Sequence, residues 1–232
     1  MTEPIISYMN DSDTFARALL ALEVLVVATF FGIFQALMFQ ENLYLILIGI
    51  GFGVACFILF GRAITQMSLK ELGLVKTALK NNVFFGILIG IILHLVFSAY
   101  YFIIYEKVLF LLPYRNLIII PIALLVVFSE ELFFRGYMLP RLEGAFKSYA
   151  TVLAVLINSI LFMFYHQSSI FNLILYGPYY STLETMIINF AGSVILSVIF
   201  VKFRSLISPT LAHVVFDILF YIHFAFPYWL IP

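Results

Sequence analysis

Long apolar runs separated by short polar segments extend along the whole chain. A helix needs about 20 apolar residues to cross the hydrocarbon core of a membrane. Seven stretches meet this requirement, at 15–39, 43–64, 82–105, 116–138, 150–170, 183–202 and 209–226. The pattern predicts an all-α protein, a polytopic bundle of about seven transmembrane helices, with six to eight as the range. We expect residues 1–232 to form one integral-membrane domain, whose motif-bearing core is 116–226.

The segments around these runs predict further features. "GIGFG" (49–53) and "GILIG" (86–90) are glycine-rich, and small residues allow helices to approach closely in lipid. Residues 65–81 mix Leu and Lys and are too polar to span, which indicates an amphipathic surface helix or a loop. "YGPYY" (176–180) interrupts the pattern before the sixth stretch and is compatible with a short interfacial or re-entrant piece.

Positive charge is distributed unevenly between the two predicted sides. Lys107 and Arg115 fall on one side, and the other Lys and Arg residues fall opposite, at 17, 62, 70, 76, 80, 135, 141, 147, 202 and 204. The positive-inside rule therefore predicts a cytoplasmic N-terminus and a C-terminus on the outer side.

Composition agrees with a membrane protein and excludes some functions. The chain is 64% hydrophobic and 10% charged, whereas soluble domains are about 25% charged. The net charge is zero, so nothing indicates nucleic-acid binding. Cys56 is the single cysteine, which excludes an internal disulfide. The acidic "MTEPIISYMNDSD" lacks the basic region of a cleavable signal peptide, so the first span is expected to remain.

Several ionisable residues lie inside the predicted spans, where they are costly and often mark a functional site. Those candidates are Glu23, His94, Glu130, Glu131, His166, His213, Asp217 and His223, with Arg135 nearer the cytoplasmic end of its span. Glu23, His94 and His223 have no partner at helical spacing and are interpreted as packing or interfacial residues.

The stretch "SEELFFRGYMLPR" (129–141) places two carboxylates and a guanidinium in one span. Glu131 and Arg135 are four residues apart with the acid first, a favourable order for a helical ion pair. Glu130 projects about 100° away around the helix, so Arg135 cannot easily serve both carboxylates. Glu130 is therefore predicted to meet a group from another helix.

Two later spans supply suitable groups. His213 and Asp217 share one face of a helix whose start is predicted at Ser208, as the N-cap, and Pro209. His166 ends "FMFYH" on the fifth span. Alone, His166 is more typical of a packing residue, but Glu130, His166, His213 and Asp217 on three separate spans together predict a shared polar cavity. Convergence requires a deep cavity, or a fifth helix that begins well before the membrane, because His166 is far from the start of its span.

A carboxylate beside a histidine can act as a general base on water, and a second histidine can donate to the oxyanion that forms. Asp217 could orient that histidine. H-E-x-x-H and G-x-S-x-G are absent, Ser193 lacks the flanking pattern of a serine nucleophile, and the motifs of intramembrane aspartyl proteases are absent. Two histidines and a carboxylate could also hold a metal, so the residues alone leave that alternative open.

Three motifs in this region resemble those of a known family. "EELFFR" matches EExxxR, "FMFYH" matches FxxxH and "HVVFD" matches HxxxN/D. In this order on successive spans, they resemble the CPBP family, the CAAX proteases and bacteriocin-processing enzymes also called Abi. The resemblance covers about 130–217.

The resemblance implies a glutamate-dependent intramembrane endopeptidase that forms no covalent intermediate and needs no cofactor. It implies that Glu130 activates water with His166, that His213 and Asp217 line the oxyanion side, and that Glu131 and Arg135 give support. Eukaryotic CAAX-processing members carry Asn where this chain has Asp217, which argues against assuming a prenylated substrate. The short chain and sparse loops are similar to prokaryotic members, and the expected location is a prokaryotic cytoplasmic membrane.

The same residues are also compatible with two functions other than proteolysis. The expected partners are a peptide or membrane-protein substrate and the lipid bilayer, and the sequence does not specify an oligomeric state. A non-catalytic scaffold or immunity protein, which binds a sensor kinase or a peptide, is an alternative that should tolerate Glu130→Gln. A proton-coupled transporter would also use buried acids, but it usually carries an internal repeat or matched broken helices.

Overall fold

Helices and turns make up the part of the chain described by the computed structural model, which covers residues 68–74, 78–105, 119–146, 150–166 and 182–223. No β-strand occurs in these ranges. The helices are α3 (Leu79–Tyr105), α4 (Ile119–Glu131), η2 (Leu132–Met138), α5 (Leu139–Ala145), α6 (Ala150–His166), α8 (Thr182–Phe203) and α9 (Ile207–His223). The all-helical class is therefore confirmed.

Two of these helices are long and apolar enough to cross a membrane, with spanning segments at Leu79–Tyr100 and Met186–Phe203. They correspond to the predicted spans 82–105 and 183–202. Ala150–His166 and Ile207–Phe220 are shorter apolar helices. The predicted spans 15–39 and 43–64 lie outside the described residues, so the count of seven stays a prediction.

The fourth predicted span differs from the expected single α-helix over 116–138. The chain is helical from Ile119 to Ala145, but Leu132–Met138 form a π-helix between α4 and α5. In this segment the Leu139 N–H donates to the Phe134 carbonyl, five residues back. Pro140 follows directly; it has no N–H to continue an α-helical ladder, and its ring crowds the carbonyl four residues earlier. A π-helical turn is a wider arrangement that is frequent at functional sites.

The π-helix lies at the centre of the described core. All its residues are buried, and Leu132, Phe133, Phe134 and their neighbours pack against Phe162 of α6 and Phe200 of α8. In contrast, α3 exposes large apolar side chains such as Phe84, Leu95 and Val96. Exposed apolar side chains on a long helix fit contact with lipid.

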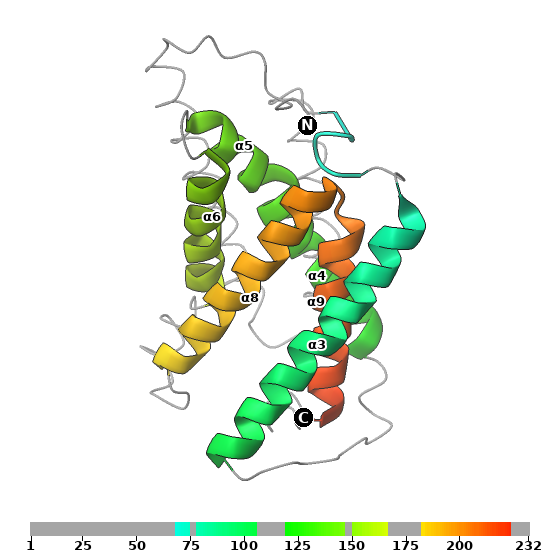
Figure 1. The fold of residues 1–232 in the computed structure, drawn as a ribbon, viewed down its shortest axis with the longest axis vertical. Helices are drawn as coiled ribbons and strands as arrows, with labels where there is room; N and C mark the ends of the chain where they lie inside the picture. The colour runs from blue at the N-terminus through cyan, green and yellow to red at the C-terminus, as the bar shows by residue number, and fades with distance from the viewer. Residues whose placement is uncertain (1–67, 75–77, 106–118, 147–149, 167–181, 224–232) are drawn as a thin grey trace.

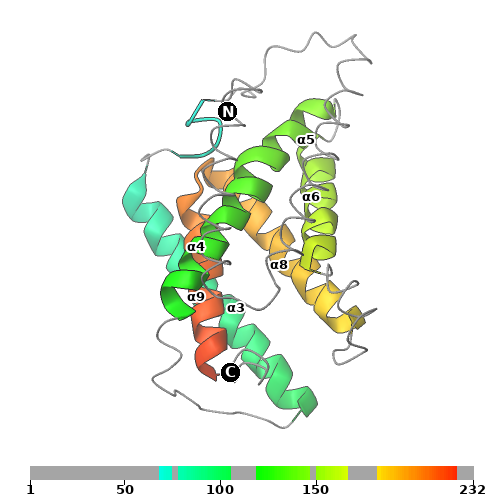
Figure 2. The ribbon, with the colours of Figure 1, turned by 180° about the vertical axis from the view of Figure 1, so that it is seen from behind.

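Helices α3 and α9 lie side by side along much of their length (Figures 1 and 2). Two glycines of α3, four residues apart, make this approach possible. A Cβ built on Gly86 would lie 2.8 Å from the Ser208 carbonyl oxygen, and one on Gly90 would lie 2.7 Å from the Ala212 carbonyl oxygen. The predicted role of "GILIG" is thus confirmed, whereas "GIGFG" (49–53) lies outside the described residues.

The start of α9 differs from the expected capping arrangement. The helix begins at Ile207, so Ser208 lies in its first turn, and its hydroxyl donates to the main-chain and side-chain oxygens of Asn82 on α3, both at 3.0 Å. The Ser205 hydroxyl accepts from the Ile207 N–H instead. The serine predicted as a cap therefore ties α9 to α3.

Residues 68–74, from the segment predicted as a surface helix or a loop, form turns. Ser68 and Glu71 exchange two hydrogen bonds, and the Gly73 carbonyl accepts from the Leu206 N–H at 3.0 Å. Leu72 is buried in the core, and its carbonyl lies 2.9 Å from a Cβ built on Gly136. This turn therefore packs against the end of the π-helix rather than only on the surface.

We expect Gly90→Ala to destabilise the protein by about 1–3 kcal/mol, because the new methyl group would overlap the backbone of α9. The measurement is thermal unfolding of the detergent-purified protein. Gly192→Ala is the matched control: a Cβ at Gly192, in the interior of α8, meets nothing within 4 Å. Equal melting temperatures for the two variants would contradict close packing at Gly90.

Candidate functional site

The predicted ion pair between Glu131 and Arg135 is present, and both side chains are fully buried. Arg135 Nη1 donates to Glu131 Oε1 at 2.9 Å. Arg135 Nη2 donates to the carbonyl oxygen of Ser193 at 3.2 Å and to its hydroxyl oxygen at 2.9 Å. A buried charge is tolerated when it is paired and hydrogen-bonded, and here α8 supplies part of that pairing.

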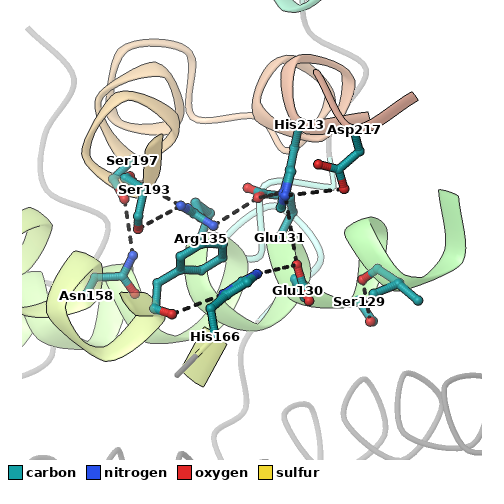
Figure 3. Close-up of polar contacts among 12 residues, drawn as sticks. Ser129, Glu130, Glu131, Arg135, Asn158, His166, Ser193, Ser197, His213 and Asp217 are labelled. Atoms are coloured by element: carbon teal, nitrogen blue, oxygen red, sulfur yellow. Dashed lines mark hydrogen bonds and ion pairs between the residues drawn. The ribbon is translucent and has the colours of Figure 1, made fainter. Parts of the chain in front are cut away.

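His213 joins the same carboxylate from α9. Its Nδ1 lies 2.8 Å from Glu131 Oε1 (Figure 3). An ionised carboxylate only accepts hydrogen bonds, so Nδ1–H is the donor and Nε2 faces the remaining acids. Glu131 Oε1 thus accepts from both Arg135 and His213, which fixes the ring of His213 against α4.

Glu130 faces two histidines from different helices. Its Oε2 lies 3.9 Å from His166 Nε2 and 4.0 Å from His213 Nε2. Both distances exceed a direct hydrogen bond, and polar groups at such a separation are suited to a bridging water. Glu130 therefore does what the sequence predicted for an acid that Arg135 does not serve: it meets groups from other helices.

His166 is oriented by its own helix and by an aromatic ring. Its Nδ1 lies 3.1 Å from the Phe162 carbonyl oxygen, which can only accept, so Nδ1 is the donor and Nε2 faces Glu130. The Phe162 ring centroid is 4.2 Å from that of His166. The same ring lies 4.5 Å from Arg135 Cζ, a cation–π distance. Phe162 thus stands between the guanidinium and His166.

Asp217 completes the cluster at its more exposed side. Its Oδ2 lies 3.8 Å from His213 Nε2, and the two residues share one face of α9 as their spacing predicted. The exposed fraction of the side chain is 21% for Asp217 and 26% for His166, against 0% for Glu131 and Arg135. The side chains of Glu131 and Arg135 are therefore more deeply buried than those of His166 and Asp217.

The structure brings Glu130, Glu131, Arg135, His166, His213 and Asp217 together from α4, η2, α6 and α9 (Figure 3). His166 lies about 24 Å along α6 and His213 about 9 Å along α9, at 1.5 Å per residue. They meet because α6 begins further from the site than α9 does. Where these helices begin relative to the membrane is not described, so the choice between a deep cavity and a fifth helix that begins before the membrane stays a prediction.

Of the other sequence candidates, only His94 has a described side chain, and its contact with Ser98 lies outside this cluster. His94 is buried on α3, where its Nε2 lies 3.2 Å from the Ser98 hydroxyl oxygen. His223 ends α9, and nothing is described of its side chain. Glu23 lies outside the described residues.

Two site residues were missed from the sequence. In the sequence, Ser193 was a candidate only for a serine nucleophile. Its contact with Arg135 joins residues 58 apart in the chain, which no local pattern predicts. Tyr165 makes a side-chain hydrogen bond to Glu130 and packs edge-on against Phe134 at 5.2 Å. The only sequence signal for Tyr165 was its position next to His166.

Two histidines and a carboxylate could in principle serve as metal ligands. Among the described residues, no group of three or more His, Cys, Asp or Glu side chains is arranged to hold a metal ion. The groups that face Glu130 are two imidazole nitrogens, His166 Nε2 at 3.9 Å and His213 Nε2 at 4.0 Å.

Residues 111–219 match the family model described as type II CAAX prenyl endopeptidase Rce1-like. The match includes every member of the cluster, from Glu130 to Asp217. No curated protein and no solved structure matches the chain.

We expect Arg135→Leu to destabilise the protein by about 3–5 kcal/mol, because it leaves the carboxylate of Glu131 buried without its cation. The double variant Arg135→Leu/Glu131→Leu should recover part of this loss. Both are measured by unfolding in detergent.

Arg204→Leu is the control for this experiment. Arg204 pairs with Glu143 through two nitrogens, Nη2 at 2.9 Å from Oε1, but its side chain is 32% exposed. Its loss should cost about 1 kcal/mol or less. A cost for Arg204→Leu equal to that of Arg135→Leu would contradict the importance of burial.

Proposed function

From the premise that residues 111–219 belong to the Rce1-like type II CAAX prenyl endopeptidase family, we propose that this chain is an intramembrane glutamate-dependent endopeptidase. The observation that carries the proposal is the position of Glu130 Oε2, at 3.9 and 4.0 Å from the Nε2 atoms of two histidines on different helices. Family membership supports a membrane-embedded peptidase. The glutamate mechanism and the role of each residue are proposed from the geometry of the cluster.

Glu130 is proposed as the general base. A water between Glu130 Oε2 and His166 Nε2 could donate one hydrogen bond to each, because the Nδ1–H of His166 is already directed to the Phe162 carbonyl. This leaves an oxygen lone pair free to attack a peptide carbonyl. As the new C–O bond forms, Glu130 takes the proton of the water.

His213 is proposed as the donor to the tetrahedral oxyanion. Its Nδ1–H is directed to Glu131, so a proton on Nε2 makes it a donor toward the space in front of Glu130. The intermediate collapses when the C–N bond breaks and Glu130 returns its proton to the leaving amine. The products are a carboxylate and an amine, and no bond to the enzyme forms.

Asp217 is proposed to orient His213 rather than to bind the oxyanion, because an ionised carboxylate cannot donate a hydrogen bond. Its 3.8 Å separation from His213 Nε2 supports a weak, long contact. Glu131 and Arg135 are proposed as supporting residues, in line with the full burial of both side chains and their direct pairing.

The proposed setting is a prokaryotic cytoplasmic membrane with the N-terminus in the cytoplasm, and the proposed substrates are peptides or membrane proteins. The family description names a prenyl endopeptidase. A requirement for a prenyl group is tested by supplying each peptide with and without the lipid.

The decisive experiment compares the purified wild type with Glu130→Gln, which keeps the shape of the side chain but removes the base. Each protein is incubated with the peptides, and mass spectrometry detects new peptide termini. We expect the wild type to generate such termini and Glu130→Gln to lower the rate of cleavage at least 100-fold, within the range for a lost general base. Glu143→Gln is the matched control, since Glu143 pairs with Arg204 away from the site. A zinc chelator is added in a parallel arm.

Each outcome discriminates between functions. Termini that need Glu130 and survive the chelator support the glutamate mechanism. Loss of cleavage with the chelator alone favours a metallopeptidase. Cleavage by Glu130→Gln at the wild-type rate overturns the role of Glu130, and no cleavage by any variant, with or without prenylation, favours the scaffold or immunity protein.

A second prediction concerns the residue that departs from the eukaryotic pattern. We expect Asp217→Asn to retain kcat within about tenfold, because the contact to His213 is longer than a hydrogen bond and an amide can also face the ring. Asp217→Leu should lose more, since it cannot make a polar contact. Steady-state cleavage rates measure both, and an Asn variant as weak as the Leu variant would mean that the negative charge itself is required.

A further inference from the structure

Ser193 lies on α8, outside the three motifs, and is fully buried. Its hydroxyl and its carbonyl oxygen both accept hydrogen bonds from Arg135 Nη2, at 2.9 and 3.2 Å. We propose that Ser193 is a positioning residue that fixes the plane of the Arg135 guanidinium and, through it, the orientation of the two histidines. The consequence for cleavage rests on the proposed function, whereas the consequence for the histidine rings does not.

The chemistry of arginine explains why one serine can have this effect. The guanidinium is planar, so contacts at its two terminal nitrogens together determine how the plane is turned. Nη1 is held by Glu131 and Nη2 by Ser193, from different helices. Without the hydroxyl of Ser193, Nη2 keeps only its longer contact to the carbonyl oxygen, and the plane is free to tilt about the contact with Glu131.

Two paths lead from this plane to the histidines. One runs through Glu131 Oε1, which is 2.9 Å from Arg135 Nη1 and 2.8 Å from His213 Nδ1. The other runs through Phe162, whose ring lies 4.5 Å from Arg135 Cζ and whose centroid is 4.2 Å from that of His166. A tilt of the guanidinium therefore affects both histidines, with the stronger effect expected along the hydrogen-bonded path to His213.

The same helix offers a matched control. Ser197 is four residues further along α8 and is also fully buried, but its hydroxyl accepts from Asn158 Nδ2 on α6 at 3.2 Å. Figure 3 shows the two serines next to each other, with Ser193 directed to Arg135 and Ser197 to Asn158. Ser197→Ala thus removes an equivalent buried hydroxyl without touching the guanidinium.

The test uses the full chain in detergent, labelled with ¹⁵N in its histidine rings. His213 signals are assigned by their loss in His213→Asn. We expect Ser193→Ala to shift the ring-nitrogen signals of His213 and to leave those of His94 unchanged, whereas Ser197→Ala leaves both unchanged. Ser193→Cys, which keeps the packing but is a weak acceptor, should behave as Ser193→Ala does and covers the case in which the alanine variant unfolds.

Kinetics provide the second readout. Ser193→Ala should lower kcat about tenfold with KM unchanged, the size expected for losing one hydrogen bond to a charged group. If Ser193 acts only through Arg135, adding Ser193→Ala to Arg135→Lys should cause little further loss. An additive loss in the double variant, or an effect of Ser197→Ala as large as that of Ser193→Ala, would overturn the proposal.

The two readouts separate this proposal from the proposed function. If the wild type cleaves nothing, the peptidase assignment fails, but the histidine spectra still decide the role of Ser193. Unchanged His213 signals in Ser193→Ala and Ser193→Cys overturn the positioning role even if the wild type is an active peptidase.

Discussion

The arrangement of the site depends on the need to satisfy one fully buried guanidinium. Arg135 cannot lose its charge in a protein, so the fold has to surround it with acceptors. Those acceptors come from Glu131 in the same helical run and from Ser193 of α8, and the ring of Phe162 covers the cation from α6. His213 of α9 then shares the carboxylate. One charge therefore links all the helices that carry the motifs.

The adjacent acids Glu130 and Glu131 have different surroundings because only Glu131 pairs with the buried guanidinium of Arg135. Glu131 is engaged by a cation and by a histidine, while Glu130 lies opposite the Nε2 atoms of His166 and His213 without a direct hydrogen bond to either. The π-helix begins immediately after them. Its residues, including Arg135 and the aromatic side chains, are buried in the core, so a local change of helix type follows directly after the carboxylate that is paired with Arg135 and the one that is not.

Much of the fold and of the site could be predicted from the sequence, because the signals were local. Apolar length predicted the all-helical class and the two long helices α3 and α8, and spacing of four predicted the Glu131–Arg135 pair and the shared face of His213 and Asp217. Glycines four apart predicted the close approach of α3 to α9.

What could not be predicted depended on contacts between distant segments or on backbone details without a sequence signature. Ser193 and Tyr165 became site residues only when α8 and α6 were placed against α4 and η2. The π-helix was missed because a run of apolar residues is compatible with several hydrogen-bond spacings. Ser208 was misplaced as a cap because its acceptor, Asn82, lies 126 residues away.

The side chains of the cluster are exposed to different degrees, and this bears on which of them an incoming molecule can contact. The side chains of Glu131 and Arg135 are fully buried, and those of His166 and Asp217 are partly exposed. Among the described residues, His166 and Asp217 are therefore the members of the cluster with the most exposed side-chain surface, whereas Glu131 and Arg135 have none. If the chain has the proposed peptidase activity, exchange of substrate and product on this side of the cluster would be one of its steps, and product release could then limit turnover as much as the chemistry does.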